Sequence, residues 1–182
     1  MRKTKQKRLV GEIKEITENE YLDPQKVIEE AGDDEEINIR LELAKDRLIR
    51  IVIISDYVLV NEQLDVIICN YFFGKKTTWK SKKFRIFNQH VLERLTLVNK
   101  IDLLEEFLSL PHPVRSFILA LNGLRNAFAH SFFPENRRRE KPLYKKKSIY
   151  KIDVLREYKK DYDEAVGFLM EKAWGVKPED TN

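Results

Sequence analysis

The longest apolar pattern in the chain runs from about residue 39 to residue 73 and contains no glycine or proline. Its apolar residues recur every three or four positions, which is the spacing of one face of a helix. They include Leu41, Ala44, Leu48, Ile51, Val52, Leu64, Ile67, Ile68 and Tyr71. The pattern predicts a single helix of about 35 residues, roughly 50 Å long at the usual rise per residue.

The same segment also leaves room for extended structure. Residues 51–54 and 57–60 are rich in β-branched side chains, which favour strands. No turn residues separate these two runs, so we favour the helix. Residues 37–43 alternate between apolar and polar side chains, which allows a short extended start. Gly74 is the predicted C′ residue that ends the helix.

Further apolar stripes predict three later helices, and a weaker pattern precedes the long one. The later stripes cover residues 84–108, residues 114 to about 133 and residues 152–173, with Pro111-His112-Pro113 between the first and second and Pro134 after the second. Asp23-Pro24 predicts the start of a short helix that ends near Gly32, before an acidic loop over residues 33–36. We therefore expect an all-α fold, a bundle of four to six helices with one long helix.

The expected organisation is one bundle with loosely attached ends. Residues 1–36 would form a basic start with short helices and the acidic loop, residues 37–173 the bundle, and residues 174–182 a flexible tail. No apolar run of about 18 residues is present, so we expect a cytoplasmic protein without a membrane partner. The single cysteine, Cys69, excludes an intramolecular disulfide and a cysteine-rich zinc site. We expect no metal and no other cofactor.

Charge is distributed unevenly, although the formal net charge is only +4. Residues 12–42 carry twelve acids and three bases, whereas residues 137–160 carry eleven bases and three acids. A second basic stretch covers residues 75–85. Clustered bases of this kind are suited to a polyanion.

The candidate chemistry lies between Leu121 and His130. Arginine offers a permanent charge and a planar donor fork for phosphate oxygens, and histidine can exchange a proton near neutral pH. On an unbroken helix, Asn126 and His130 share a face, while Arg125 points about 140° away from His130. Cleavage of RNA without a metal needs a base, an acid and positive charge on the phosphorane. Arg125 could supply the charge, His130 one proton transfer, and Asn126 a contact to the imidazole or to phosphate.

Arg125-Asn126, three further residues and His130 together resemble the arginine–polar–histidine signature of HEPN domains. The order of elements over residues 40–170 is most similar to the mannitol operon repressor-like branch of that superfamily. The resemblance implies a homodimer in which both Arg/His pairs line one cleft and cleave RNA by attack of the 2′-hydroxyl. The products would be a 2′,3′-cyclic phosphate and a 5′-hydroxyl. It also implies that Glu62 orients the arginine or the histidine.

A basic rim could extend this site. By itself, a run of lysines and arginines is usually solvated surface, but one that follows His130 so closely predicts contacts with phosphates. Trp79, in the other basic stretch, could stack on a base. The predicted nucleic-acid-binding residues are Arg137, Arg138, Arg139, Lys141, Lys145, Lys146, Lys147 and Trp79.

Two classes of function remain open at this point. One is a metal-independent endoribonuclease of the toxin or defence type, with RNA as substrate and a separate antitoxin or regulatory protein as a possible partner. The alternative is a noncatalytic protein that binds RNA or another nucleic acid, or a regulator of the mannitol repressor-like type. In the second case His130 could cap its helix and Arg125 could pair with Glu62. Glu62 and Asp65 lie on the long apolar helix, so each is either exposed or paired.

Overall fold

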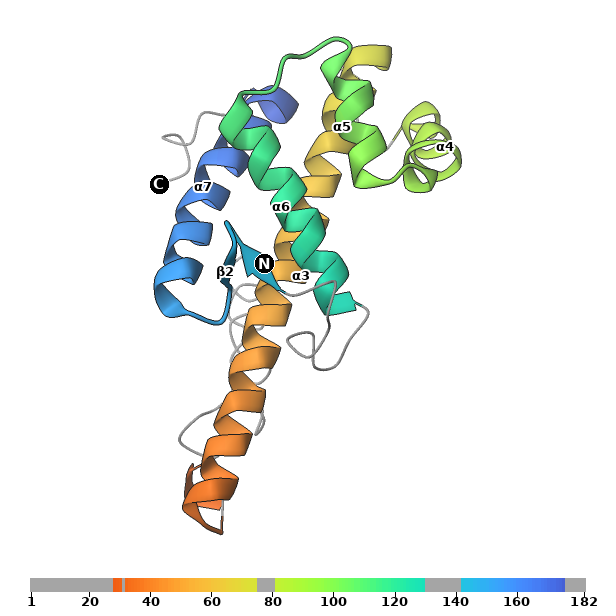
Figure 1. Ribbon diagram of the computed structural model, residues 1–182. Coiled ribbons are helices and arrows are strands. Elements are labelled where there is room, and N and C mark those ends of the chain that lie inside the picture. Colours follow the sequence, from red (N-terminus) through yellow and green to blue (C-terminus); the bar gives the residue numbers. More distant parts are fainter. Residues whose placement is uncertain (1–27, 31, 75–80, 130–141, 176–182) are drawn as a thin grey trace, which may run out of the picture. The chain divides into compact units, whose positions relative to one another are not determined.

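The computed structural model describes residues 28–30, 32–74, 81–129 and 142–175. The chain divides into two compact units, residues 1–52 and residues 53–182. The basic start, the first part of the short helix expected after Asp23-Pro24 and the last seven residues lie outside the described residues. Residues 28–30 of that expected helix are described and are helical. The described elements are almost entirely helical, which confirms the all-α prediction (Figure 1).

Helix α3 (Asp34–Phe73) is the long helix and has 40 residues. The predicted extended start is wrong, because residues 37–43 are helical. The last three residues of the expected acidic loop belong to the first turn of α3, where carboxylates interact favourably with the helix dipole. Asp33 caps this turn, since its Oδ1 accepts from the Glu36 N–H at 2.8 Å. Gly74 ends the helix with φ +81°, which confirms the C′ prediction.

The single helix predicted over residues 84–108 is wrong. The segment forms helix α4 (Lys82–His90), a 3₁₀ turn η1 (Leu92–Arg94) and helix α5 (Leu97–Glu105). Thr96 causes the second start, because its Oγ1 accepts the N–H of Asn99 at 3.2 Å and so caps α5. Leu92 and Leu97 are both buried, so the apolar stripe continues through a break in the helix.

The last part of the chain adds two helices and one small hairpin. Helix α6 (His112–Ala129) begins at the first histidine-proline pair and helix α7 (Ile152–Trp174) ends at Gly175. The loop expected over residues 135–150 contains strands β1 (Leu143–Tyr144) and β2 (Lys147–Ser148), which pair antiparallel. Lys145 and Lys146 form the two-residue loop between them, with φ values of 46° and 66°. Positive φ at both positions is the geometry of a type I′ turn.

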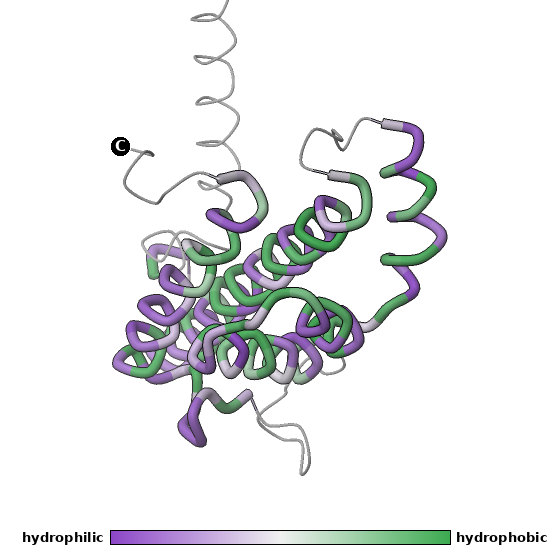
Figure 2. The backbone as a smooth tube through the Cα atoms, turned by 90° about the horizontal axis from the view of Figure 1, so that it is seen from above, coloured by the Kyte–Doolittle hydropathy of each residue, from purple (hydrophilic) through white to green (hydrophobic). Residues whose placement is uncertain are grey.

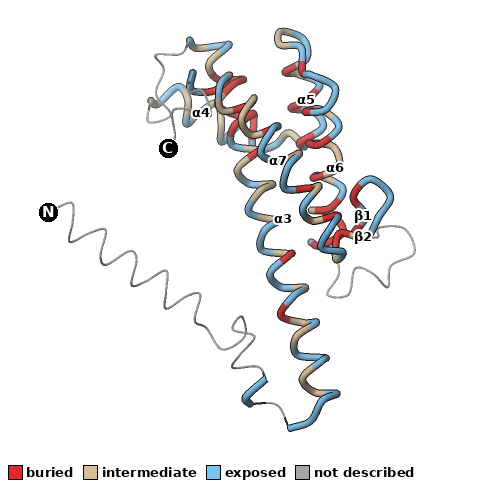
Figure 3. The backbone as a smooth tube through the Cα atoms, turned by 90° about the vertical axis from the view of Figure 1, so that its left-hand side faces the viewer, coloured by how far each residue is buried: buried red, intermediate tan, exposed pale blue. Residues whose placement is uncertain are grey.

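The core of the second unit lies among the second half of α3, α5, α6 and α7. Helix α6 lies between α5 and α7 in Figure 1 and contacts both. Figure 2 shows apolar and polar residues alternating around the helices, as amphipathic helices require. Figure 3 shows that buried residues are frequent in the second half of α3 and rare in its first half. Fully buried members of this core include Leu64, Ile68, Ile101, Leu104, Ile118, Leu121, Tyr158 and Leu169.

Two buried tyrosines in this core pair with carboxylates. The Tyr158 hydroxyl donates to Asp56 Oδ2 at 2.8 Å and joins α7 to α3. The Tyr144 hydroxyl donates to Asp161 Oδ2 at 2.5 Å and joins the hairpin to α7. Burial, followed by these carboxylates, raises the pKa of both phenols, so both remain donors throughout the physiological range. None of the described helices is long and apolar enough to cross a membrane.

Candidate phosphate-binding site

The Arg125 guanidinium lies near the end of α6, against α3. Its Cζ is 5.2 Å from the centre of the Tyr57 ring, within the range of a cation–π contact. Its Nη1 donates to Asn126 Oδ1 at 3.1 Å. Within the described part of the chain, an aromatic face and a neutral amide hold this charge, and no carboxylate pairs with it. The other donors of the guanidinium have no partner among the described residues.

Buried neighbours on α6 fix the position of this arginine. Leu121, Leu124 and Phe128 face the core, while Arg125 and Asn126 are half-buried at its edge. A helix places residues three and four apart on one face. Because the buried residues fix how α6 is rotated, they also fix Arg125 at the edge of that face, beside Tyr57 of α3. His130 comes next after the last residue of α6 but lies outside the described residues. Its convergence with Arg125 stays a prediction.

A second arginine on the same helix shows the contrast. Arg115 Nε donates to both carboxylate oxygens of Glu105, at 2.9 and 3.2 Å, and thereby joins α6 to α5. Its charge is paired with a carboxylate, whereas Arg125 has no carboxylate partner among the described residues. Arg115 is therefore the natural control for any experiment on Arg125.

Gly123 leaves open space beside this site. It is exposed on α6, and a Cβ built at this position would meet no atom within 4 Å. A glycine inside a helix costs about 1 kcal/mol relative to alanine. No close contact within the described chain explains that cost. The backbone of another helix could therefore approach α6 closely at Gly123.

Only part of the predicted basic rim lies in the described residues. Arg137, Arg138, Arg139, Lys141 and Trp79 lie outside them. Lys145 is described, and it pairs with two carboxylates of α7. Its Nζ lies 2.6 Å from Asp161 and 2.9 Å from Glu157, and these hydrogen bonds raise its pKa. Its predicted role in binding nucleic acid is therefore weakened by two carboxylates. Lys146 and Lys147 are exposed on the hairpin and remain the described members of the rim.

The two carboxylates on α3 have different environments. Glu62 is exposed and lines a pocket with residues of α4 and α7. Asp65 is buried, and its Oδ1 lies 2.6 Å from Lys100 Nζ. Among the described residues, the partners of Arg125 are Tyr57 and Asn126, and Glu62 is not one of them. The orienting role that the resemblance implies for Glu62 stays a prediction.

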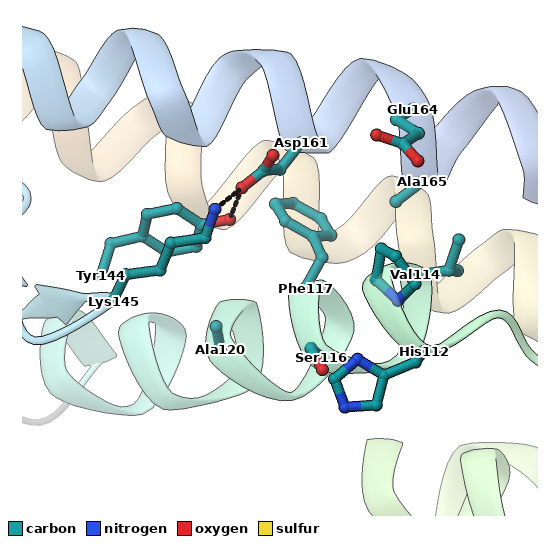
Figure 4. A pocket seen from close by; sticks show the side chains of 11 residues that line it. His112, Val114, Ser116, Phe117, Ala120, Tyr144, Lys145, Asp161, Glu164 and Ala165 are labelled. Atoms are coloured by element: carbon teal, nitrogen blue, oxygen red, sulfur yellow. Dashed lines mark hydrogen bonds and ion pairs between the residues drawn. The ribbon is translucent and has the colours of Figure 1, made fainter.

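Sequence reasoning missed a cavity at the start of α6. His112, expected in an exposed loop, is exposed but is the first residue of α6, with Pro113 after it. It lines a cavity of about 290 Å³ together with Ser116 and residues of the hairpin and α7. In Figure 4, Lys145 and the Tyr144 hydroxyl both reach Asp161, so the polar groups at that end satisfy one another. At that end of the cavity, the charges of Lys145 and Asp161 are already paired with each other.

Comparison with family models, curated proteins and solved structures finds no match to this chain. The likeness to HEPN domains therefore rests on Arg125, Asn126, His130 and their helical setting. Among the described residues, no three histidine, cysteine, aspartate or glutamate side chains are grouped to hold a metal ion.

Proposed function

We propose that the protein is a cytoplasmic, metal-independent endoribonuclease of the HEPN type, active as a homodimer. The observation that supports it most is the Arg125 guanidinium, which sits on Tyr57 without a carboxylate partner among the described residues. An arginine committed to structure would be expected in a pair such as Arg115–Glu105. An arginine that binds an anion would instead be held by uncharged groups, as Tyr57 and Asn126 hold Arg125.

In this mechanism Arg125 binds the scissile phosphate and stabilises the charge that develops on the phosphorane. The Asn126 amide holds the guanidinium in place. His130 transfers a proton, either from the attacking 2′-hydroxyl or to the leaving 5′-oxygen. One imidazole cannot perform both transfers at once, so a second copy of the chain supplies the other. The products are a 2′,3′-cyclic phosphate and a 5′-hydroxyl.

The open surface at Gly123 supports the dimer. Without a side chain there, the backbone of α6 can be approached closely by the same helix of a second copy. A toxin or defence role would also require a separate antitoxin or regulatory protein that holds the activity in check.

The test compares Arg125→Ala and His130→Ala with Arg115→Ala on end-labelled total RNA. Removing a group that stabilises the transition state lowers the rate by about 100-fold or more. We expect that loss in the first two variants, and cleavage close to wild type in Arg115→Ala. Circular dichroism and urea unfolding establish that each variant is folded. Cleavage that survives both Arg125→Ala and His130→Ala would refute the proposal.

A noncatalytic RNA-binding protein is the second candidate, and exposed Lys146 and Lys147 favour it. Contacts to phosphates through lysines weaken steeply as salt rises. If wild type and all three variants bind RNA in a salt-sensitive manner and none cleaves it, this candidate replaces the nuclease. Loss of cleavage with RNA affinity retained in His130→Ala favours the nuclease.

A further inference from the structure

A second pocket does not include Arg125 or Asn126 in its lining. It has a volume of about 370 Å³ and lies between the second half of α3, helix α4 and the end of α7. Sites for small molecules typically have about 300 to 1,000 Å³, so this pocket is large enough for a small ligand. Its lining residues are Glu62, Gln63, Asp65, Val66, Phe84, Asn88 and Trp174.

The walls of this pocket are firmly placed. The Trp174 indole N–H donates to Gln63 Oε1 at 2.7 Å, which fixes the ring against α3. Two turns further along α3, Asn70 Nδ2 donates to the carbonyl of Ala173 at 2.7 Å, which holds the end of α7 in place. On the other side, Phe84 belongs to the first turn of α4, which Ser81 caps. The pocket therefore has preformed apolar walls.

Unpaired acceptors line the pocket. Asp65 is 7% exposed; its Oδ1 lies 2.6 Å from Lys100 Nζ in an ion pair but has no hydrogen bond of good geometry among the described residues. Asn88 Oδ1 is buried and has no hydrogen-bond partner there either. Glu62 adds an exposed carboxylate at the rim. The Trp174 indole N–H, a donor in the wall, already donates to Gln63.

Among the described charges that act on Asp65, carboxylates outnumber cations. Lys100 is 2% exposed and is shared between Asp65 and Asn61, whose Oδ1 accepts from its Nζ at 2.9 Å. Burial raises the pKa of Asp65, and the charges of Glu93 and Glu62 raise it further. One buried ammonium therefore faces several carboxylates. An added cation would offset the remaining negative charge and satisfy the open acceptors.

We propose that this pocket binds a small organic cation, with a protonated amine directed at Glu62, Asp65 and Asn88 and an apolar body against Phe84 and Trp174. Aromatic walls suit an organic ammonium, because ring faces attract cations and apolar surface covers the rest of the ligand. A hydrated metal ion would gain nothing from those walls. The proposal does not depend on the nuclease.

The test uses benzylamine and benzyl alcohol, which have nearly the same shape but differ in charge at pH 7. The chain has two tryptophans, so the full-length Trp79→Phe variant makes Trp174 the only reporter of binding by fluorescence. We expect saturable binding of benzylamine and binding of benzyl alcohol weaker by about tenfold or more, since hydrogen bonds to charged groups differ from neutral ones by that amount. Magnesium chloride at the same ionic strength should produce no saturable change.

Two substitutions locate the cation. In the Trp79→Phe background, Glu62→Gln removes one acceptor charge and Asn88→Leu removes the open amide oxygen, and each should weaken benzylamine binding by about tenfold. Glu106→Gln makes the same charge change as Glu62→Gln but at the exposed C-cap of α5, outside the pocket, and should leave binding unchanged. Equal affinity for amine and alcohol, no effect of both pocket substitutions, or saturation by magnesium alone would each overturn the proposal.

Discussion

Replacing Lys100 with methionine should lower the free energy of unfolding more than the same replacement at an exposed lysine. Lys100 is 2% exposed, and its ammonium is 2.6 Å from Asp65 Oδ1. At that separation and an effective dielectric constant near 20, the attraction amounts to about 6 kcal/mol before the cost of removing both charges from water. Breaking a buried pair by removing one partner typically costs about 3 to 5 kcal/mol, because the other charge stays buried and unpaired.

The loss should also depend on pH. Burial raises the pKa of Asp65 above its ordinary value of 3.8, and contact with Lys100 opposes this. The folded protein thus holds the Asp65 proton more tightly than the unfolded chain. The contribution of Asp65 to stability is then greatest at low pH and falls as pH rises from 3.8 through the folded pKa. Without Lys100 the folded pKa rises further, so Lys100→Met should be more destabilising at pH 8 than at pH 5.

Urea unfolding at the two pH values measures both effects. Lys83→Met is the control, because Lys83 is exposed on α4. The double variant Lys100→Met/Asp65→Asn should recover part of the loss at pH 8, since no buried charge is left unpaired. A loss for Lys100→Met below about 1 kcal/mol, or one that is equal at pH 5 and pH 8, would show that the pair does not stabilise the fold as described.

Three other substitutions test particular parts of the structure by urea unfolding. Gly123→Ala should raise the free energy of unfolding by about 0.5 to 1 kcal/mol. The same change should weaken the dimer measured by sedimentation, and an unaltered dimer would contradict the role given to this glycine. Lys146→Gly should also stabilise, by about 1 kcal/mol, because φ +66° strains any side chain; a loss would mean that Lys146 makes a contact that offsets the strain. Tyr158→Phe should cost about 1 to 3 kcal/mol by removing the donor to half-buried Asp56, and an unchanged midpoint would contradict the importance of that bond.

Helical periodicity predicted the long helix, the last helix and the helix of Arg125 because their buried faces are continuous. The break between α4 and α5 was missed, since the apolar stripe runs on through Leu92 and Leu97 while Thr96 starts a new helix. Thr96 could have indicated this break, because threonine commonly caps the start of a helix. The hairpin was missed for a different reason: its turn residues are Lys145 and Lys146 rather than the asparagine and glycine that usually adopt positive φ.

The contacts of the candidate site join distant parts of the sequence, which periodicity cannot pair. Arg125 was identified from its residue type and spacing, but nothing in the sequence indicated that Tyr57 would lie beneath it. The exposed-or-paired alternatives for the two α3 acids were resolved only by packing: Glu62 is exposed, and Asp65 is paired with Lys100. The open pocket beside them depends on α4 and α7, whose positions no local pattern predicts.

The most direct test of the central claim is cleavage of one defined RNA and of the same RNA carrying a single 2′-deoxynucleotide at the cleaved position. Attack by the 2′-hydroxyl predicts that wild-type protein in the presence of EDTA leaves a 2′,3′-cyclic phosphate on the first RNA. It also predicts that the second RNA is not cut at that position. Cleavage of the deoxy-substituted RNA at the same bond, or no cleavage of either RNA by a dimeric, folded protein, would contradict the account.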